Sequence, residues 1–168
     1  MSRRTNTSKT GLRRLQKEQC TLKVAAGKKP GEEGYLEGCA AHPVSESDFF
    51  NWVGTISGPP DTPYEGGTFN LSLSFAGGYP LRPPKAKFIT RVFHPNISRD
   101  GGICLDILKN QWSPALTIGS LLQSIRSLLD DPNASDPLDP EAGALYRDNI
   151  EAFAAKARQY TLEYAIPK

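Results

Sequence analysis

The sequence predicts an α+β domain in which an N-terminal helix, a four-stranded antiparallel meander and a central loop precede C-terminal helices. Three observations predict this order. An amphipathic stretch near the N-terminus is followed by short β-like runs with turn-sized gaps, and a helical period of apolar residues begins after residue 117. The 168 residues suit one domain with a full core, and no internal repeat, glycine-rich phosphate loop or second domain is indicated.

The N-terminal region is basic. Residues 1–10 are mostly Ser, Thr, Arg and Lys without apolar periodicity, so we predict a disordered tail there and a folded core over residues 11–168. A helix is expected from about Lys9 to Val24, with leucines on one side and cationic residues on the other faces. Residues 1–29 carry nine Lys or Arg and only Glu18 as an acid. This balance is typical of a surface for an acidic partner or nucleic acid, and also of a solvated helix face.

The predicted strands follow a loop. Residues 25–38 are rich in glycine and charge and are expected to form this loop. Aromatic and β-branched residues over Phe49–Ile56 favour a strand, and Thr68–Phe75 alternates apolar and polar residues as a half-buried strand does. A short strand is expected over Ala86–Ile89, after a proline-rich break. The turn-sized gaps predict an antiparallel meander.

The period changes to a helical one after the central loop. Thr117 is expected to cap an amphipathic helix that ends at Pro132. Its apolar stripe consists of Ile118, Leu121, Leu122, Ile125, Leu128 and Leu129. Asp139 followed by Pro140 predicts the N-cap and first residue of another helix. A last helix is expected to carry Ile150, Phe153, Ala157, Tyr160 and Tyr164.

Composition limits the classes of function. Three cysteines, Cys20, Cys39 and Cys104, cannot all pair, and no spacing resembles a zinc site, so neither a disulfide scaffold nor a metal or cofactor is predicted. No apolar run approaches the roughly 20 residues of a membrane span, and the polar N-terminus does not resemble a secretory signal. A reducing cytoplasmic or nuclear compartment is therefore expected.

The central loop, Phe93–Trp112, concentrates the residues suited to chemistry. Asn96 precedes Cys104 by eight positions, which lets the loop fold back and bring the amide near the thiol. A thiol can carry an acyl group, and an amide can stabilise the oxyanion of a tetrahedral intermediate. The alternatives are a cysteine that is only a small buried hydrophobe and an asparagine that only closes a turn.

A base for the thiol is less evident. His94 lies in the same loop and is a candidate, although a histidine before a proline is as often a structural hydrogen-bonder, and nothing ties His42 to the cysteine. A cysteine without a dedicated base can still exchange one thioester for another at small cost in free energy. The loop therefore favours an acyl carrier over a thiol hydrolase.

The residues of this loop resemble a known family. His94-Pro95-Asn96, then Gly-Ile-Cys104-Leu-Asp-Ile-Leu and Trp112-Ser-Pro-Ala are similar to the active-site region of ubiquitin-conjugating enzymes. The resemblance extends to the C-terminus and back to about Trp52, with a further basic helix near the N-terminus. It implies the fold of these enzymes and a ubiquitin thioester on Cys104.

The resemblance implies roles for other residues of the site. Asn96 would hold the loop and stabilise the oxyanion formed when a lysine attacks, and Asp136 would orient and deprotonate that lysine. Asp106 matches a position that supports lysine transfer and ranks below Asp136. His94 stays a catalytic candidate beside its structural alternative.

The resemblance also implies docking surfaces for an activating enzyme and a ligase. They would comprise Arg13, Arg14 and Lys17 on the first helix, and Pro80, Leu81, Arg82, Ser113, Pro114 and Ala115 in two loops. Leu81 replaces a commoner phenylalanine, so RING-type ligases are expected more firmly than HECT-type ones. Gln123 and Ser124 would contact the carried ubiquitin, and Gln123 replaces a leucine of close relatives.

Two departures from the family stand out. The loop at 25–38 is longer than usual, and Ala40 replaces a serine that some relatives use to bind a second ubiquitin on the back of the sheet. Only seven residues separate Cys104 from Trp112, which fits the broad ubiquitin class better than SUMO conjugation or dedicated chain builders.

The expected partners are ubiquitin, its activating enzyme, ligases and substrate proteins, without membrane or nucleic acid. A carrier of another ubiquitin-like protein, a non-catalytic relative and a thiol hydrolase are the alternatives.

Overall fold

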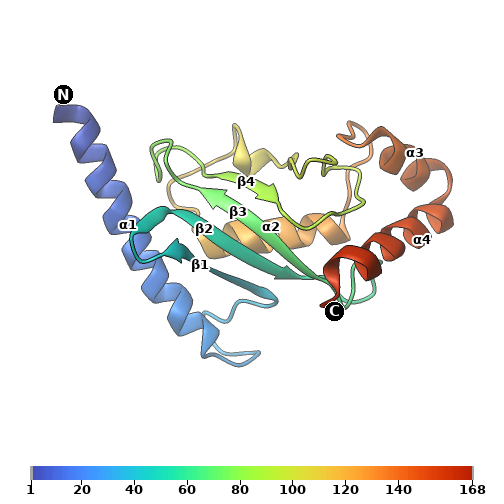
Figure 1. Cartoon of the computed structure of the whole chain (residues 1–168), viewed down its shortest axis with the longest axis horizontal. Coiled ribbons are helices and arrows are strands. Elements are labelled where there is room, and N and C mark those ends of the chain that lie inside the picture. The colour runs from blue at the N-terminus through green and yellow to red at the C-terminus, as the bar shows by residue number, and fades with distance from the viewer. Residues whose placement is uncertain (1, 168) are drawn as a thin grey trace.

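The computed structural model describes residues 2–167, with side chains described from residue 9 onward (Figure 1). Within these residues, four α-helices and one four-stranded sheet follow one another in an α+β order, as predicted. The elements are α1 (Ser2–Ala26), β1 (Cys39–Ser45), β2 (Asp48–Ser57), β3 (Thr68–Ser74), β4 (Lys85–Phe88), the 3₁₀ turn η1 (Asp106–Leu108), α2 (Ile118–Asp130), α3 (Pro140–Asp148), α4 (Ile150–Tyr160) and the π-helical η2 (Thr161–Ala165).

The sheet is an antiparallel meander of order β1-β2-β3-β4. Alternation along β3 turns Phe69, Leu71 and Leu73 to one face, where all three are buried. Helix α2 lies across that face, whereas α1 lies along the β1 side and α3 and α4 lie at the opposite end (Figure 1). The alternate residues of β3, namely Thr68, Asn70 and Ser72, are polar and exposed on the other face.

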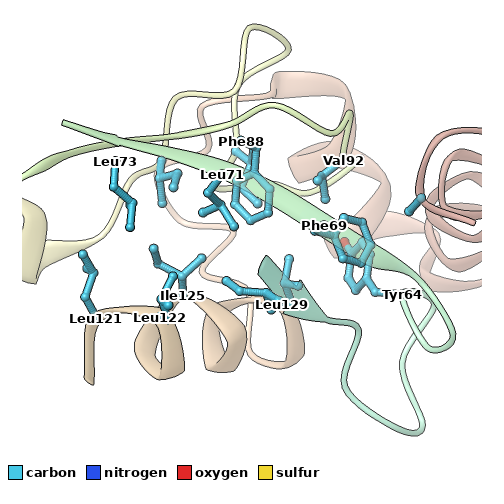
Figure 2. Close-up of a cluster of buried hydrophobic side chains, with 14 of the residues drawn as sticks. Tyr64, Phe69, Leu71, Leu73, Phe88, Val92, Leu121, Leu122, Ile125 and Leu129 are labelled. Carbon is cyan, nitrogen blue, oxygen red and sulfur yellow. The ribbon is translucent and has the colours of Figure 1, made fainter. Parts of the chain in front are cut away.

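The core forms between β3 and α2. Figure 2 shows Leu121, Leu122, Ile125 and Leu129 of the helix pointing toward the sheet residues. Burying each such side chain contributes about 1.5–3 kcal/mol relative to exposure. The two layers approach so closely that a Cβ at Gly54 would lie 3.0 Å from Leu122 Cδ2.

Local signals place the starts of α2 and α3 as predicted. Thr117 Oγ1 accepts a hydrogen bond from Ser120 N at 3.1 Å, and Ser120 Oγ accepts one from Thr117 N at 2.8 Å, which forms a capping box. Asp139 caps α3, with Pro140 as its first residue. These short-range bonds satisfy amide groups that a helix start leaves open.

The first strand, β1, was not located from the sequence, and the first and last helices also differ from those expected. Helix α1 begins at Ser2, within the stretch predicted to be a disordered tail at residues 1–10, because a helix once nucleated extends at one hydrogen bond per residue. It also includes Ala25 and Ala26 of the predicted loop. In the last helix, Phe153 and Ala157 are buried, but Ile150 is 53% exposed and the segment after Tyr160 widens into a π turn. None of the helices within residues 2–167 combines the length and apolar character needed to cross a membrane.

Candidate active site

The loop of Cys104 folds back on itself, as the spacing predicts. Cys104 N donates a hydrogen bond to Asn96 O at 2.9 Å, and Ile97 pairs with Ile103. The turn depends on Gly101, whose φ is +96° and whose added Cβ would lie 2.2 Å from Phe88 O. The fold-back brings the asparagine and the cysteine to adjacent positions.

Asn96 is buried and holds a second loop in place. Its Nδ2 donates to Asn133 O at 2.7 Å, and its Oδ1 accepts from Asn133 N at 2.8 Å. The side-chain amide carries two hydrogens, and this pairing uses only one of them. Asn133 was not singled out from the sequence, because the two residues are 37 positions apart. Asn96 therefore joins the Cys104 loop to the segment between α2 and α3.

His94 adopts the structural role that was the alternative to catalysis. Its Nδ1 accepts a hydrogen bond from Asn96 N at 2.9 Å, and its Nε2 donates to Leu128 O at 2.7 Å. Burial lowers the pKa of His94 to about 4, although the Leu128 carbonyl opposes this shift. The ring is therefore neutral near pH 7 and has no free nitrogen to accept a proton from Cys104.

The Cys104 thiol is partly exposed and lies beside a cation. Lys109 Nζ is 3.8 Å from Cys104 Sγ and can donate a long hydrogen bond to the sulfur. Lys109 was not singled out from the sequence, although a lysine only five positions after the cysteine was a signal. No base from a second histidine accompanies the thiol, because His42 is exposed on β1, a strand at the far edge of the sheet.

The two candidate acids are both exposed. Asp136 lies in the α2–α3 segment that Asn96 clamps through Asn133, and the carboxylate has no hydrogen-bond or ion-pair partner among the described residues. Asp106 begins η1, where its carbonyl accepts bonds from Lys109 N at 2.9 Å and Gln111 N at 3.0 Å. Both carboxylates are therefore free to bind a cationic group from a partner.

The predicted docking residues of the two loops are brought together. Trp112 Nε1 donates to Pro80 O at 2.9 Å, which joins the two loops. Leu81 is 72% exposed beside the exposed Arg82. Pro114 and Ala115 are exposed on the second loop, and Ser113 is half-buried. The two joined loops therefore present Leu81, Pro114 and Ala115 as exposed apolar residues.

A buried carboxylate, Glu18, ties the first helix to these loops. Its oxygens accept hydrogen bonds from Ile118 N at 2.8 Å, from Arg14 Nε at 3.1 Å and from the Tyr79 hydroxyl. Burial and the adjacent Glu18 carboxylate raise the pKa of Tyr79 far above its usual value. The solitary acid in a basic stretch was the sequence signal that could have identified this residue.

The first-helix cations divide into two kinds. Arg14 is largely internal, because it pairs with Glu18, donates to Leu116 O at 3.0 Å and stacks over Tyr79. Arg13 and Lys17 are exposed and available to a partner. The structure therefore separates one structural arginine from the two surface cations.

The remaining predicted positions lie on separate surfaces. Gln123 is exposed on α2, whereas Ser124 is half-buried and donates back to Ser120 O at 2.9 Å. Ala40 is exposed on β1 and pairs with Thr55. Burial raises the pKa of the neighbouring Cys39 to about 11, so that thiol stays protonated near pH 7. Within residues 2–167, no group of three or more His, Cys, Asp or Glu side chains is placed to hold a metal ion.

Comparisons of the sequence and the fold with known proteins agree on one class of protein. A family model described as ubiquitin-conjugating enzyme matches residues 28–161. The E2 domain of a Toxoplasma gondii ubiquitin-conjugating enzyme is 41% identical over 92% of this chain and 98% of its own, with a TM-score of 0.80. A Plasmodium yoelii protein assigned to the ubiquitin-conjugating enzymes is 45% identical over 94% of this chain and 97% of its own, with a TM-score of 0.81.

The fold and the site thus define a protein of the ubiquitin-transfer machinery. The chain belongs to the ubiquitin-conjugating enzyme family. Membership supports ubiquitin transferase activity, and it implies ubiquitin, an activating enzyme and ligases as the general partners.

Proposed function

We propose that Cys104 accepts the C-terminus of ubiquitin as a thioester from the activating enzyme and passes it to a lysine amine or a ligase cysteine. The observation that carries this proposal is a partly exposed thiol whose backbone amide is bonded to Asn96, with both nitrogens of the nearby His94 already engaged. A thiol without a base relays an activated acyl group but hydrolyses it slowly.

Three residues assist the transfer of ubiquitin from Cys104 to the lysine. The free N–H of the Asn96 amide stabilises the oxyanion formed when the lysine attacks. The Asp136 carboxylate attracts the lysine ammonium group and takes up its proton, with Asp106 in a supporting role. Activation of ubiquitin consumes ATP on the activating enzyme, and this chain needs no cofactor.

Exposed residues indicate the surfaces that bind the activating enzyme, the ligase and the carried ubiquitin. Arg13, Lys17, Leu81, Pro114 and Ala115 form the surface for the activating enzyme and a RING-type ligase, and HECT-type ligases are the less firmly expected partners because of Leu81. The α2 face with Gln123 and Ser124 contacts the carried ubiquitin. We place the reaction in the cytoplasm or nucleus.

Charging tests the proposal. Purified chain with activating enzyme, ATP and ubiquitin is expected to form an adduct that thiol reductant cleaves, and Cys104→Ser is expected to form a reductant-resistant ester. Cys39→Ser is the matched control and should charge like the native protein. No reductant-sensitive adduct would overturn the proposal, and preferential charging with another ubiquitin-like protein would reassign the carrier.

A further inference from the structure

A groove runs along the outer edge of the sheet to the Cys104 loop. Its volume is about 910 Å³, and its walls come from β3, β4, the turn before β4 and the segment around η1. Ile103 and Leu108, on either side of Cys104 in the chain, line this groove. A chain segment lying in this groove is therefore led toward the thiol.

Every charged residue that lines the groove is a cation. These residues are Arg82, Lys85, Lys87 and Lys109. Lys87 forms an ion pair with Asp100 at 3.7 Å, but the two side chains are 59% and 76% exposed, so water screens this pair strongly. Arg82, Lys85 and Lys109 have no ion-pair partner among the described residues.

This concentration of positive charge is local. Beyond residue 29 the sequence holds seventeen acids and eleven bases, yet four of those bases line one groove that contains no Asp or Glu. Cations gathered on low-dielectric walls raise the local concentration of anionic ligands. The groove is therefore suited to a carboxylate-rich ligand.

The lining favours a polypeptide over a nucleic acid. Pro83, Pro84, Ala86, Ile103 and Leu108 give it apolar walls, whereas none of its described lining residues is aromatic. Proteins that bind single-stranded nucleic acid combine a basic groove with aromatic side chains on which the bases stack. Alternating charged and aliphatic contacts suit an extended acidic peptide.

We propose that this groove binds an acidic segment of the acceptor protein beside the lysine that receives ubiquitin. The inference rests on the proposed function, because it assumes a thioester on Cys104. Lys109 links the two sites, since its Nζ lies 3.8 Å from Cys104 Sγ while its side chain lines the groove. Acidic residues bound at Lys85 and Lys87 would hold the acceptor lysine close to the thioester.

The groove acts on a balanced transfer step. The deprotonated lysine nitrogen attacks the thioester carbonyl carbon, a C–N bond forms, and the C–S bond breaks with Cys104 Sγ leaving as the thiolate. Two protons leave the lysine nitrogen. The Asp136 carboxylate takes up the first, as in the proposed function, and the second, released as the amide forms, passes to solvent. Binding of the flanking segment makes this attack effectively intramolecular and raises the rate at low acceptor concentration.

The test compares paired acceptor peptides on the purified thioester. One peptide carries a single lysine flanked by glutamates, and its partner carries glutamines in the same places. Discharge is expected to be about three to ten times faster for the acidic peptide at low salt, and the ratio should fall toward one at 0.5 M salt. The expected ratio for Lys85→Glu/Lys87→Glu is one or less.

Control variants separate the effect of charge in the groove from the effect of net charge elsewhere on the protein. Lys29→Glu/Arg147→Glu makes the same change in net charge at exposed positions outside the groove and should keep the native ratio. Lys85→Gln/Lys87→Gln serves if the reversed pair fails to fold, and its ratio should also approach one. Because each assay starts from isolated thioester, only folded and charged protein is counted.

The outcomes distinguish the groove from the proposed function. A native ratio of one, or a native-like ratio in the groove variants, would refute the groove while leaving the thioester intact. Failure of the native chain to form any thioester would refute the proposed function instead. Blocking of discharge by a single-stranded oligonucleotide, with no preference between the peptides, would reassign the groove to nucleic acid and refute the acceptor role.

Discussion

Replacing Asn96 with alanine should affect lysine transfer far more than stability. The change removes two hydrogen bonds to Asn133, at 2.7 and 2.8 Å, each contributing about 0.5–1.5 kcal/mol net. The expected loss of unfolding free energy is therefore about 1–3 kcal/mol, or a fall in Tm of roughly 2–12 °C at about 2–4 °C per kcal/mol. Loss of an oxyanion donor lowers the rate about 10²–10³-fold. Partial unfolding of the variant cannot account for this loss, because most of the protein stays folded.

The assay separates these effects. Unfolding in urea gives stability, and single-turnover discharge of the isolated thioester to free lysine gives transfer. Asn133→Ala is the matched control: it removes the bonds that Asn133 Oδ1 accepts from Ser135 N at 3.1 Å and Ser135 Oγ at 2.6 Å, but leaves the Asn96 amide in place. It should lose comparable stability and retain discharge within about tenfold of native. Equal losses of discharge in both variants would show that loop geometry, and not the amide, sustains transfer.

Three further predictions concern stability. Burial lowers the pKa of His94 to about 4, so below about pH 6.5 the unfolded state binds a proton that the folded state does not. The unfolding free energy should therefore drop by about 3 kcal/mol between pH 7 and pH 4. Glu18→Gln should cost about 1.5–3 kcal/mol in urea unfolding, since the bonds to Ile118 N and Arg14 Nε lose their charged acceptor. Gly101→Ala should lower Tm by several degrees, because its φ is +96° and an added Cβ would lie 2.2 Å from Phe88 O.

Each of these predictions has its own check. NMR of the His94 ring should show a neutral imidazole down to about pH 5, and protonation near pH 6.5 would contradict the assigned burial effect. Glu151→Gln, at an exposed position, should change stability by less than about 0.5 kcal/mol. Gly77→Ala meets no atom within 4 Å and should leave Tm nearly unchanged, so a loss equal to that of Gly101→Ala would argue against the clash.

The long surface loop joins α1 to the sheet and also touches α2. Leu36 packs on Gly119, where an added Cβ would lie 3.1 Å from Leu36 Cδ1. Gly38 O accepts a hydrogen bond from Ser57 N at 2.8 Å, which anchors the end of the loop to β2. The loop is thus packed against the domain at two points, although its length alone suggested only an exposed connection.

Local patterns in the sequence predicted most of the elements, although they did not locate β1. The alternation of β3, the cap at Thr117 and the Asp139-Pro140 pair each depend on neighbours within a few residues, so they were predictable without knowledge of the fold. The grouping of Asn96 and Cys104 was also local, because eight positions allow one backbone bond to close the loop.

Only the tertiary structure decided which alternative each polar residue follows. His94 became a buried, neutral hydrogen-bonder because Leu128, 34 positions away, occupies its Nε2. Glu18 became a structural acid because the fold brings it to Ile118, 100 positions away. Periodicity and capping depend on neighbouring residues, so the sequence alone determined them. Hydrogen-bond partners and burial depend on long-range packing, so only the tertiary structure decided them.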